Sequence, residues 1–174
     1  MLHTRQTTSL PAFQKCRPAS RLWGLQKTAV VCAGVKSILD VPRTLEYLET
    51  RGVTVASLKS EEFPAIYSPN SGVRSPLVLD SVKDAAEIIY NNRELGLPSG
   101  FLLACPTPSP LDGVDEAIEV ALKQVPPGIL GKDVTPWILA KVAEITGGDS
   151  VKANCDLVDN NARVGGECKF PFCS

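Results

Sequence analysis

The chain has 174 residues, a length typical of one domain with an extension. Its 18 Lys and Arg nearly balance its 19 Asp and Glu, and the net charge of −1 argues against a dedicated nucleic-acid binder or a polybasic membrane-surface protein. No apolar run approaches the roughly 18–20 residues of a membrane-spanning helix, and 44% hydrophobic residues are typical of a soluble globular protein.

The amino-terminal segment differs from the rest of the chain in charge. No acidic residue precedes Asp40, whereas basic residues are frequent there. Residues 1–25 are predicted to be a divergent, disordered leader, and the protein is then expected in the cytoplasm. The alternative is a mitochondrial transit peptide, because such peptides are basic and poor in acidic residues. Pro11 and Pro18 weaken the amphipathic helix that this alternative needs.

Short apolar runs alternate with helical segments along the rest of the chain. The runs predict strands over residues 28–33, 53–56 and 100–105. Capping residues and apolar periodicity predict helices over 40–52, 81–96, 112–122, 133–145 and 150–161. This alternation predicts an α/β fold, an incomplete α/β/α layered sheet with flanking helices.

Two segments show neither the helical nor the strand pattern of apolar residues. Residues 61–74 are rich in Pro, Gly, Ser and Asn, which predicts an irregular loop on the surface or near a site. Residues 163–174 contain two adjacent glycines and a proline, and they are predicted to be a divergent tail. The domain itself is then expected to span residues 26–162.

Cysteine and histidine restrict the chemistry. The six cysteines lack the paired spacing of zinc sites, so they are expected to be reduced thiols, with Cys32 and Cys105 buried. The single histidine, His3, lies in the leader, which argues against Ser–His and Cys–His nucleophile schemes. Lysine and carboxylates must therefore carry any catalysis.

Ligands of α/β proteins bind beyond the carboxyl ends of the strands, where loops 34–37 and 106–110 are predicted. Lys36 follows a buried strand there, and apolar neighbours could make it a neutral, nucleophilic amine. The alternatives are a solvated lysine or one that binds a phosphate.

The last predicted helix also carries polar residues. Residues 159–161 either cap this helix or face a ligand, whereas Asp156 is expected to be a surface acid.

Several longer motifs resemble one known family. The motifs are residues 32–40 (CAGVKSILD), 44–53 (TLEYLETRGV), 63–65 (FPA), 131–136 (GKDVTP), 142–154 (VAEITGGDSVKAN) and 160–161 (NN). They closely resemble the pseudouridine-5′-phosphate glycosidases, over about the carboxyl-terminal half of that domain. The resemblance implies reversible cleavage of the C–C glycosidic bond of pseudouridine 5′-phosphate to uracil and ribose 5-phosphate.

The resemblance also assigns roles to residues. It implies that Lys36 adds to C1′ of the ring-opened sugar as an imine, and that Asn154 contacts the substrate. It further implies Mn²⁺ as cofactor, a small-molecule substrate as partner and a homo-oligomer.

The chain departs from the family pattern at several positions. The family's general acid, its phosphate-binding lysine and its metal-binding aspartate have no counterpart, so no metal ligand is predicted here. Cys105 stands where relatives usually have Asn. A sheet shortened in this way would expose an apolar edge at its first strand and be marginally stable without a partner. The alternative function is therefore a catalytically incomplete isoform that acts only as a non-catalytic partner of full-length subunits.

Overall fold

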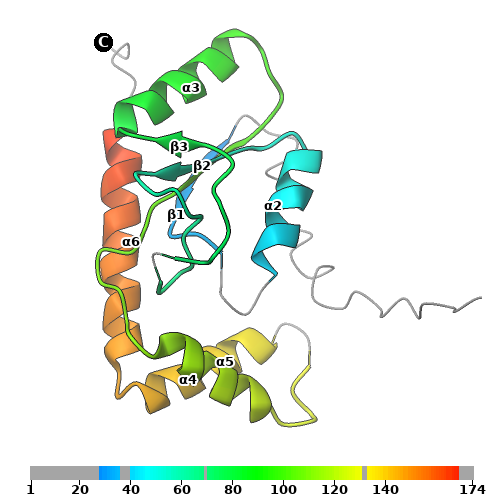
Figure 1. Cartoon of the computed structure of the whole chain (residues 1–174), viewed down its shortest axis with the longest axis vertical. Helices are drawn as coiled ribbons and strands as arrows, with labels where there is room; N and C mark the ends of the chain where they lie inside the picture. Colours follow the sequence, from blue (N-terminus) through cyan, green and yellow to red (C-terminus); the bar gives the residue numbers. More distant parts are fainter. Residues whose placement is uncertain (1–27, 36–39, 69, 131–132, 169–174) are drawn as a thin grey trace, which may run out of the picture.

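A computed structural model describes residues 28–35, 40–68, 70–130 and 133–168 (Figure 1). In this part of the chain, four strands form one parallel sheet in the order β1-β4-β2-β3. The strands are β1 (Ala29–Cys32), β2 (Thr54–Leu58), β3 (Val78–Leu79) and β4 (Phe101–Ala104). The predicted α/β class is therefore confirmed. The sequence did not predict β3, which has only two residues.

Helices cover both faces of the sheet. They are α2 (Val41–Thr50), α3 (Val82–Glu94), α4 (Val114–Lys123), α5 (Val134–Ile145) and α6 (Asp149–Glu167). Figure 1 shows α2 on the opposite side of the strands from α6. Successive strand residues point to opposite faces, so Leu102 packs with α2 and Leu103 packs with α3 and α6. This arrangement is the predicted α/β/α layering.

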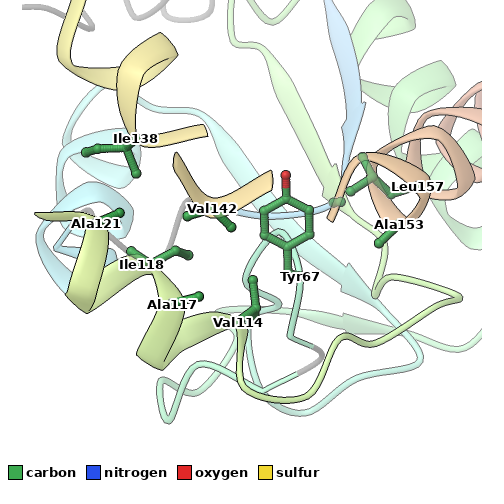
Figure 2. Packing of buried hydrophobic residues seen from close by; sticks show 10 residues of the cluster. Tyr67, Val114, Ala117, Ile118, Ala121, Ile138, Val142, Ala153 and Leu157 are labelled. Carbon is green, nitrogen blue, oxygen red and sulfur yellow. The ribbon is translucent and has the colours of Figure 1, made fainter. Parts of the chain in front are cut away.

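A third apolar cluster lies beyond the carboxyl ends of the strands. It joins α4, α5 and the beginning of α6, and it includes Ala33, the residue after β1. Figure 2 shows the Tyr67 ring among these side chains. The loop that carries Tyr67 is thereby fixed between the sheet and the helices at this end.

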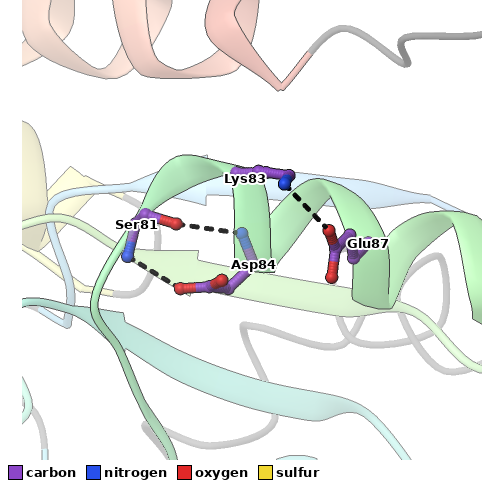
Figure 3. A network of polar contacts seen from close by, with 4 residues as sticks. All are labelled: Ser81, Lys83, Asp84 and Glu87. Atoms are coloured by element: carbon purple, nitrogen blue, oxygen red, sulfur yellow. Dashed lines mark hydrogen bonds and ion pairs between the residues drawn. The ribbon is translucent and has the colours of Figure 1, made fainter.

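Local signals place two of the helix starts as predicted. The Asp40 side chain accepts a hydrogen bond of 3.0 Å from the Arg43 backbone N–H and caps α2. Ser81 and Asp84 form the predicted capping box of α3, with bonds of 3.2 and 2.9 Å (Figure 3). The nearby ion pair of Lys83 and Glu87 is exposed at 3.7 Å and therefore contributes little.

Helix α6 is longer than the sequence predicts. Its end was expected near Asn161, but the helix continues through Gly165 and Gly166 to Glu167. The prediction of a non-helical segment from residue 163 is therefore wrong as far as Glu167. Each glycine costs about 1 kcal/mol relative to alanine, but Val164 is buried against the sheet, which contributes about 1.5–3 kcal/mol. The predicted leader, residues 1–25, lies outside the described residues.

Strand β1 forms one edge of the described sheet, pairing with β4 on one side. Val30, Val31 and Cys32 are half-buried, and α6 packs against the strand. The expectation of marginal stability at this edge stays a prediction.

No helix among residues 28–35, 40–68, 70–130 and 133–168 has the length and apolar character needed to cross a membrane.

Two buried serines hold the long connection between β2 and β3. The Ser57 hydroxyl donates to Ser75 Oγ at 2.7 Å, and the Ser75 hydroxyl donates to the Leu77 carbonyl at 2.9 Å. Both side chains are buried. Sequence patterns predicted the irregular loop between them but gave no sign of this pair.

Replacing Ser75 by alanine should destabilise the fold. The Ser57 hydroxyl would then be buried without its acceptor, which costs about 1–3 kcal/mol in the free energy of unfolding. Denaturant unfolding measures the loss, with Ser68→Ala as the control, because the Ser68 hydroxyl bonds to the exposed backbone of Asn70, two residues away. The double variant Ser57→Ala/Ser75→Ala should lose no more than Ser75→Ala alone. Equal losses in Ser75→Ala and Ser68→Ala would contradict this account.

Candidate functional site at the carboxyl edge of the sheet

Three segments meet where the parallel strands end: residues 33–35, 59–68 and 105–110. We call them together the carboxyl edge. Beyond β1 the chain bends at Ala33 and continues to Val35, which forms an isolated parallel bridge with Ala65. The Val35 N–H donates to the Pro64 carbonyl at 3.3 Å, and the Ile66 N–H donates to the Val35 carbonyl at 3.2 Å. The continuation of β1 is thereby joined to the loop after β2.

Gly34 makes this junction possible. Its φ is +99°, and a Cβ built on it would lie 1.8 Å from the Pro64 carbonyl oxygen. No other residue fits this approach of two backbones, since any side chain would overlap Pro64. Lys36, the predicted nucleophile, lies outside the described residues. The structure therefore fixes the path of the chain up to Val35, the residue before it.

The FPA motif forms the other half of the junction. Phe63, Pro64 and Ala65 are buried, and the Phe63 N–H donates to the Val73 carbonyl at 2.8 Å. The Ser71 hydroxyl donates to the Phe63 carbonyl. The motif thus serves as a buried support for the segment that leads to Lys36.

Asn154, the predicted substrate contact, is exposed on α6. Asn161 follows seven residues later, which places both on the same side of the helix two turns apart. Gly165 continues this flank, and its built Cβ would lie 3.8 Å from Val31 of β1. The flank that carries both asparagines therefore faces the β1 side of the sheet.

The Asn161 side chain has an unusual oxygen. Its Oδ1 is buried and has no hydrogen-bond partner among the residues that the structure describes. Such an atom costs free energy unless a ligand or a water supplies a donor. Because α6 continues past this residue, the interpretation of residues 159–161 as a cap is wrong. Asn160 instead accepts a hydrogen bond of 2.9 Å from Arg163 Nη2.

Asp156 lies on the other flank of α6, toward the loop after β4. Its Oδ2 accepts a hydrogen bond of 2.8 Å from the Ser109 hydroxyl. The expectation of a mere surface acid is therefore wrong. The signal that could have found it is its spacing from the buried Ala153, three residues earlier and so on the same side of α6.

Two thiols near the carboxyl edge have raised pKa values. Burial raises the pKa of Cys105 to about 12; the Cys32 and Cys168 thiols add to this shift, and Arg163 opposes it. Burial also raises the pKa of Cys32, against a hydrogen bond from the Gly34 backbone. Cys105 is fully buried as predicted, whereas Cys32 is half-buried. Among the described cysteines, 32, 105, 155 and 168 are all free thiols, also as expected.

The described residues offer no group of three His, Cys, Asp or Glu side chains that could hold a metal ion. The Mn²⁺ that the family resemblance implies stays an expectation, and no chemical step is assigned to it.

Comparison with known proteins places the chain among related sequences. The family model described as "Indigoidine synthase A like protein" matches residues 22–169. The pseudouridine-5′-phosphate glycosidase of Caldanaerobacter subterraneus subsp. tengcongensis is 49% identical over 142 residues, which cover 79% of this chain and 46% of that protein. The Arabidopsis thaliana protein of the same name is 43% identical over 156 residues, covering 86% and 47%.

Two solved structures share the fold. An indigoidine synthase A-like protein from Thermotoga maritima superposes with a TM-score of 0.74 at 33% identity, covering 84% of this chain and 50% of that one. The prealnumycin C-glycosynthase AlnA, in complex with ribulose 5-phosphate, superposes with a TM-score of 0.76 at 32% identity, covering 87% and 51%. The chain spans about half the length of the curated relatives it matches.

Gly34→Ala should destabilise the protein far more than Gly52→Ala. Both glycines have positive φ, so either alanine carries a strain of about 1–2 kcal/mol. Only the Gly34 variant also meets Pro64, since nothing lies within 4 Å of a Cβ on Gly52. The overlap should add about 1–3 kcal/mol. Denaturant unfolding of the two variants gives the difference, and equal losses would contradict the close approach.

Cys105 should resist alkylation in the folded protein. With a pKa of about 12, a fraction on the order of 10⁻⁴ is thiolate at pH 8, and its labelling should increase as the pH rises toward that value. The exposed Cys155 should react before Cys105. Iodoacetamide labelling with peptide mass analysis tests this order, and both sites should react readily in denaturant. Equal native rates at pH 8 would refute it.

Proposed function

Because this chain belongs to the indigoidine synthase A-like family, we propose that it takes part in the reversible cleavage of pseudouridine 5′-phosphate to uracil and ribose 5-phosphate. Relatives that are 49% and 43% identical carry the name pseudouridine-5′-phosphate glycosidase, which supports this substrate. The observation that carries the proposal is the contact of Gly34 with Pro64, because it brings the chain that leads to Lys36 onto the carboxyl edge.

The bond to be cleaved explains why an amine is needed. A C–C glycosidic bond has no oxygen or nitrogen to protonate, so the paired carboxylates of ordinary glycosidases are not sufficient. We assign the nucleophile to Lys36. In the direction of synthesis, its amine condenses with the C1 aldehyde of open-chain ribose 5-phosphate, and one water molecule leaves as the imine forms.

The asparagines of α6 suit a sugar phosphate. An amide side chain offers two N–H donors and one carbonyl acceptor, which match hydroxyl and phosphate oxygens. We propose that Asn154 makes these contacts from the flank that faces β1. The ribulose 5-phosphate bound by the similar C-glycosynthase AlnA supports a pentose phosphate as ligand. The homo-oligomer that the resemblance implies stays part of the proposal.

Borohydride reduction in the presence of ribose 5-phosphate should attach the sugar to Lys36. Reduction converts the imine to a stable secondary amine, and peptide mass analysis locates the added mass. Lys36→Ala should lose the adduct, whereas Lys83→Ala should keep it, because Lys83 lies on the exposed surface of α3. An unmodified Lys36 peptide, or labelling spread over surface lysines, would contradict the assignment.

Uracil release from pseudouridine 5′-phosphate, assayed with and without Mn²⁺, then tests complete turnover. No residue of this chain matches the general acid that the family resemblance implies, and such a group contributes about 10²–10⁴ in rate. We therefore expect adduct formation at Lys36 with turnover slower by that factor or more than in a full-length relative. Adduct without any turnover would favour the non-catalytic alternative, and turnover at the relative's rate would exclude it.

A further inference from the structure

The bond between Ser109 and Asp156 connects two elements that both border the carboxyl edge. Ser109 lies on the loop after β4, one of the two inner strands, and Asp156 lies on α6. The two residues are 47 positions apart in the chain, and the oxygens are 2.8 Å apart. A hydroxyl that donates to a carboxylate makes a stronger bond than one between neutral groups.

Backbone hydrogen bonds hold the two ends of the loop after β4. The Cys105 N–H donates to the Cys32 carbonyl at 2.7 Å, and the Leu111 N–H donates to the Tyr67 carbonyl at 3.2 Å. Between these ends, Pro106, Pro108 and Pro110 carry no backbone N–H and cannot donate hydrogen bonds. The Ser109 hydroxyl joins this middle part of the loop to α6.

The beginning of α6 is held mainly by packing. The helix follows Gly147 and Gly148, with φ of 60° and 95°, and the Ser150 N–H donates to Thr146 Oγ1 at 3.3 Å. Ala153 and Leu157 bury one side of the helix against α4 and α5. Such apolar contacts are non-directional, whereas the bond from Ser109 to Asp156 adds a directional contact on one flank.

Asn154 and Asp156 lie on nearly opposite sides of α6. Two residues correspond to about 200° around an α-helix, so Asp156 faces the loop after β4 while Asn154 lies on the flank toward β1. Any rotation of the helix that moves one of these side chains moves the other as well.

We propose that Asp156 is a positioning residue for the sugar phosphate: its bond to Ser109 adds to the packing of α6, sets the rotation of the helix more narrowly and so holds Asn154 toward the carboxyl edge. The inference rests on the proposed function, because it gives Asn154 the role of a ligand contact. Asp156 itself touches Ser109 and not the substrate.

The test compares Ser109→Ala, Asp156→Ala and the double variant in the borohydride reaction. Each single variant should raise the ribose 5-phosphate concentration for half-maximal trapping about three- to tenfold, the factor that one hydrogen bond contributes. The maximal trapping rate should stay nearly the same. The double variant should show no larger effect than either single one, because both remove the same bond.

Conservative variants separate positioning from simple destabilisation. Asp156→Asn and Ser109→Thr keep the acceptor and the donor, so they should restore most of the sugar affinity. Glu119→Ala removes an exposed carboxylate from α4 and should leave the affinity unchanged. Additive effects of the two alanine variants, or no recovery with the conservative ones, would overturn the inference.

Amide hydrogen exchange from Thr107 to Asp112 distinguishes failure of the inference from failure of the proposed function. If the wild type forms no adduct at Lys36, the proposed function fails, and positioning for a sugar fails with it. Exchange that is faster in both alanine variants would then still show that the bond orders the loop. If the wild type forms the adduct and the variants match it in sugar affinity, the inference alone is overturned.

Discussion

The contact between Gly34 and Pro64 is the constraint on which the carboxyl edge depends. Two backbone segments approach here without any side chain between them, one continuing β1 and one following β2. Hydrogen bonds on both sides of Val35 then hold the two segments together. Because the FPA segment is itself buried and bonded to residues 71 and 73, the whole loop after β2 supports the end of β1.

Helix α6 joins the remaining parts of the site. Its buried side packs on the sheet through Val164 and on α4 and α5 through Ala153 and Leu157. Its two flanks face different neighbours: Asn154 and Asn161 lie toward β1, and Asp156 lies toward the loop after β4. One rigid element therefore relates two strand ends, and a rigid element places side chains more accurately than a loop does.

The sequence predicted the parts of the fold that local interactions determine. Ser81 with Asp84 and Asp40 with Arg43 satisfy helix ends within a few residues, so their positions could be inferred from spacing. The end of α6 could not, because Val164 stabilises the glycine-containing turn only through its contact with a distant sheet. The Ser57–Ser75 and Ser109–Asp156 pairs were missed for the same reason. For the site, the sequence predicted strand β1, which leads toward Lys36, and the helix that carries Asn154. The reason for the FPA motif emerged only from its contact with Gly34.

The strand order has a consequence for how the chain is made. Ala29 of β1 pairs with Phe101 of β4, and β4 also separates β1 from β2. A ribosome adds about 5–20 residues per second, so the first strand waits several seconds for its neighbour to be synthesised. During this interval the apolar run of β1 is available to chaperones or to other nascent chains, and β4 joins β1 to β2 only when it emerges from the exit tunnel.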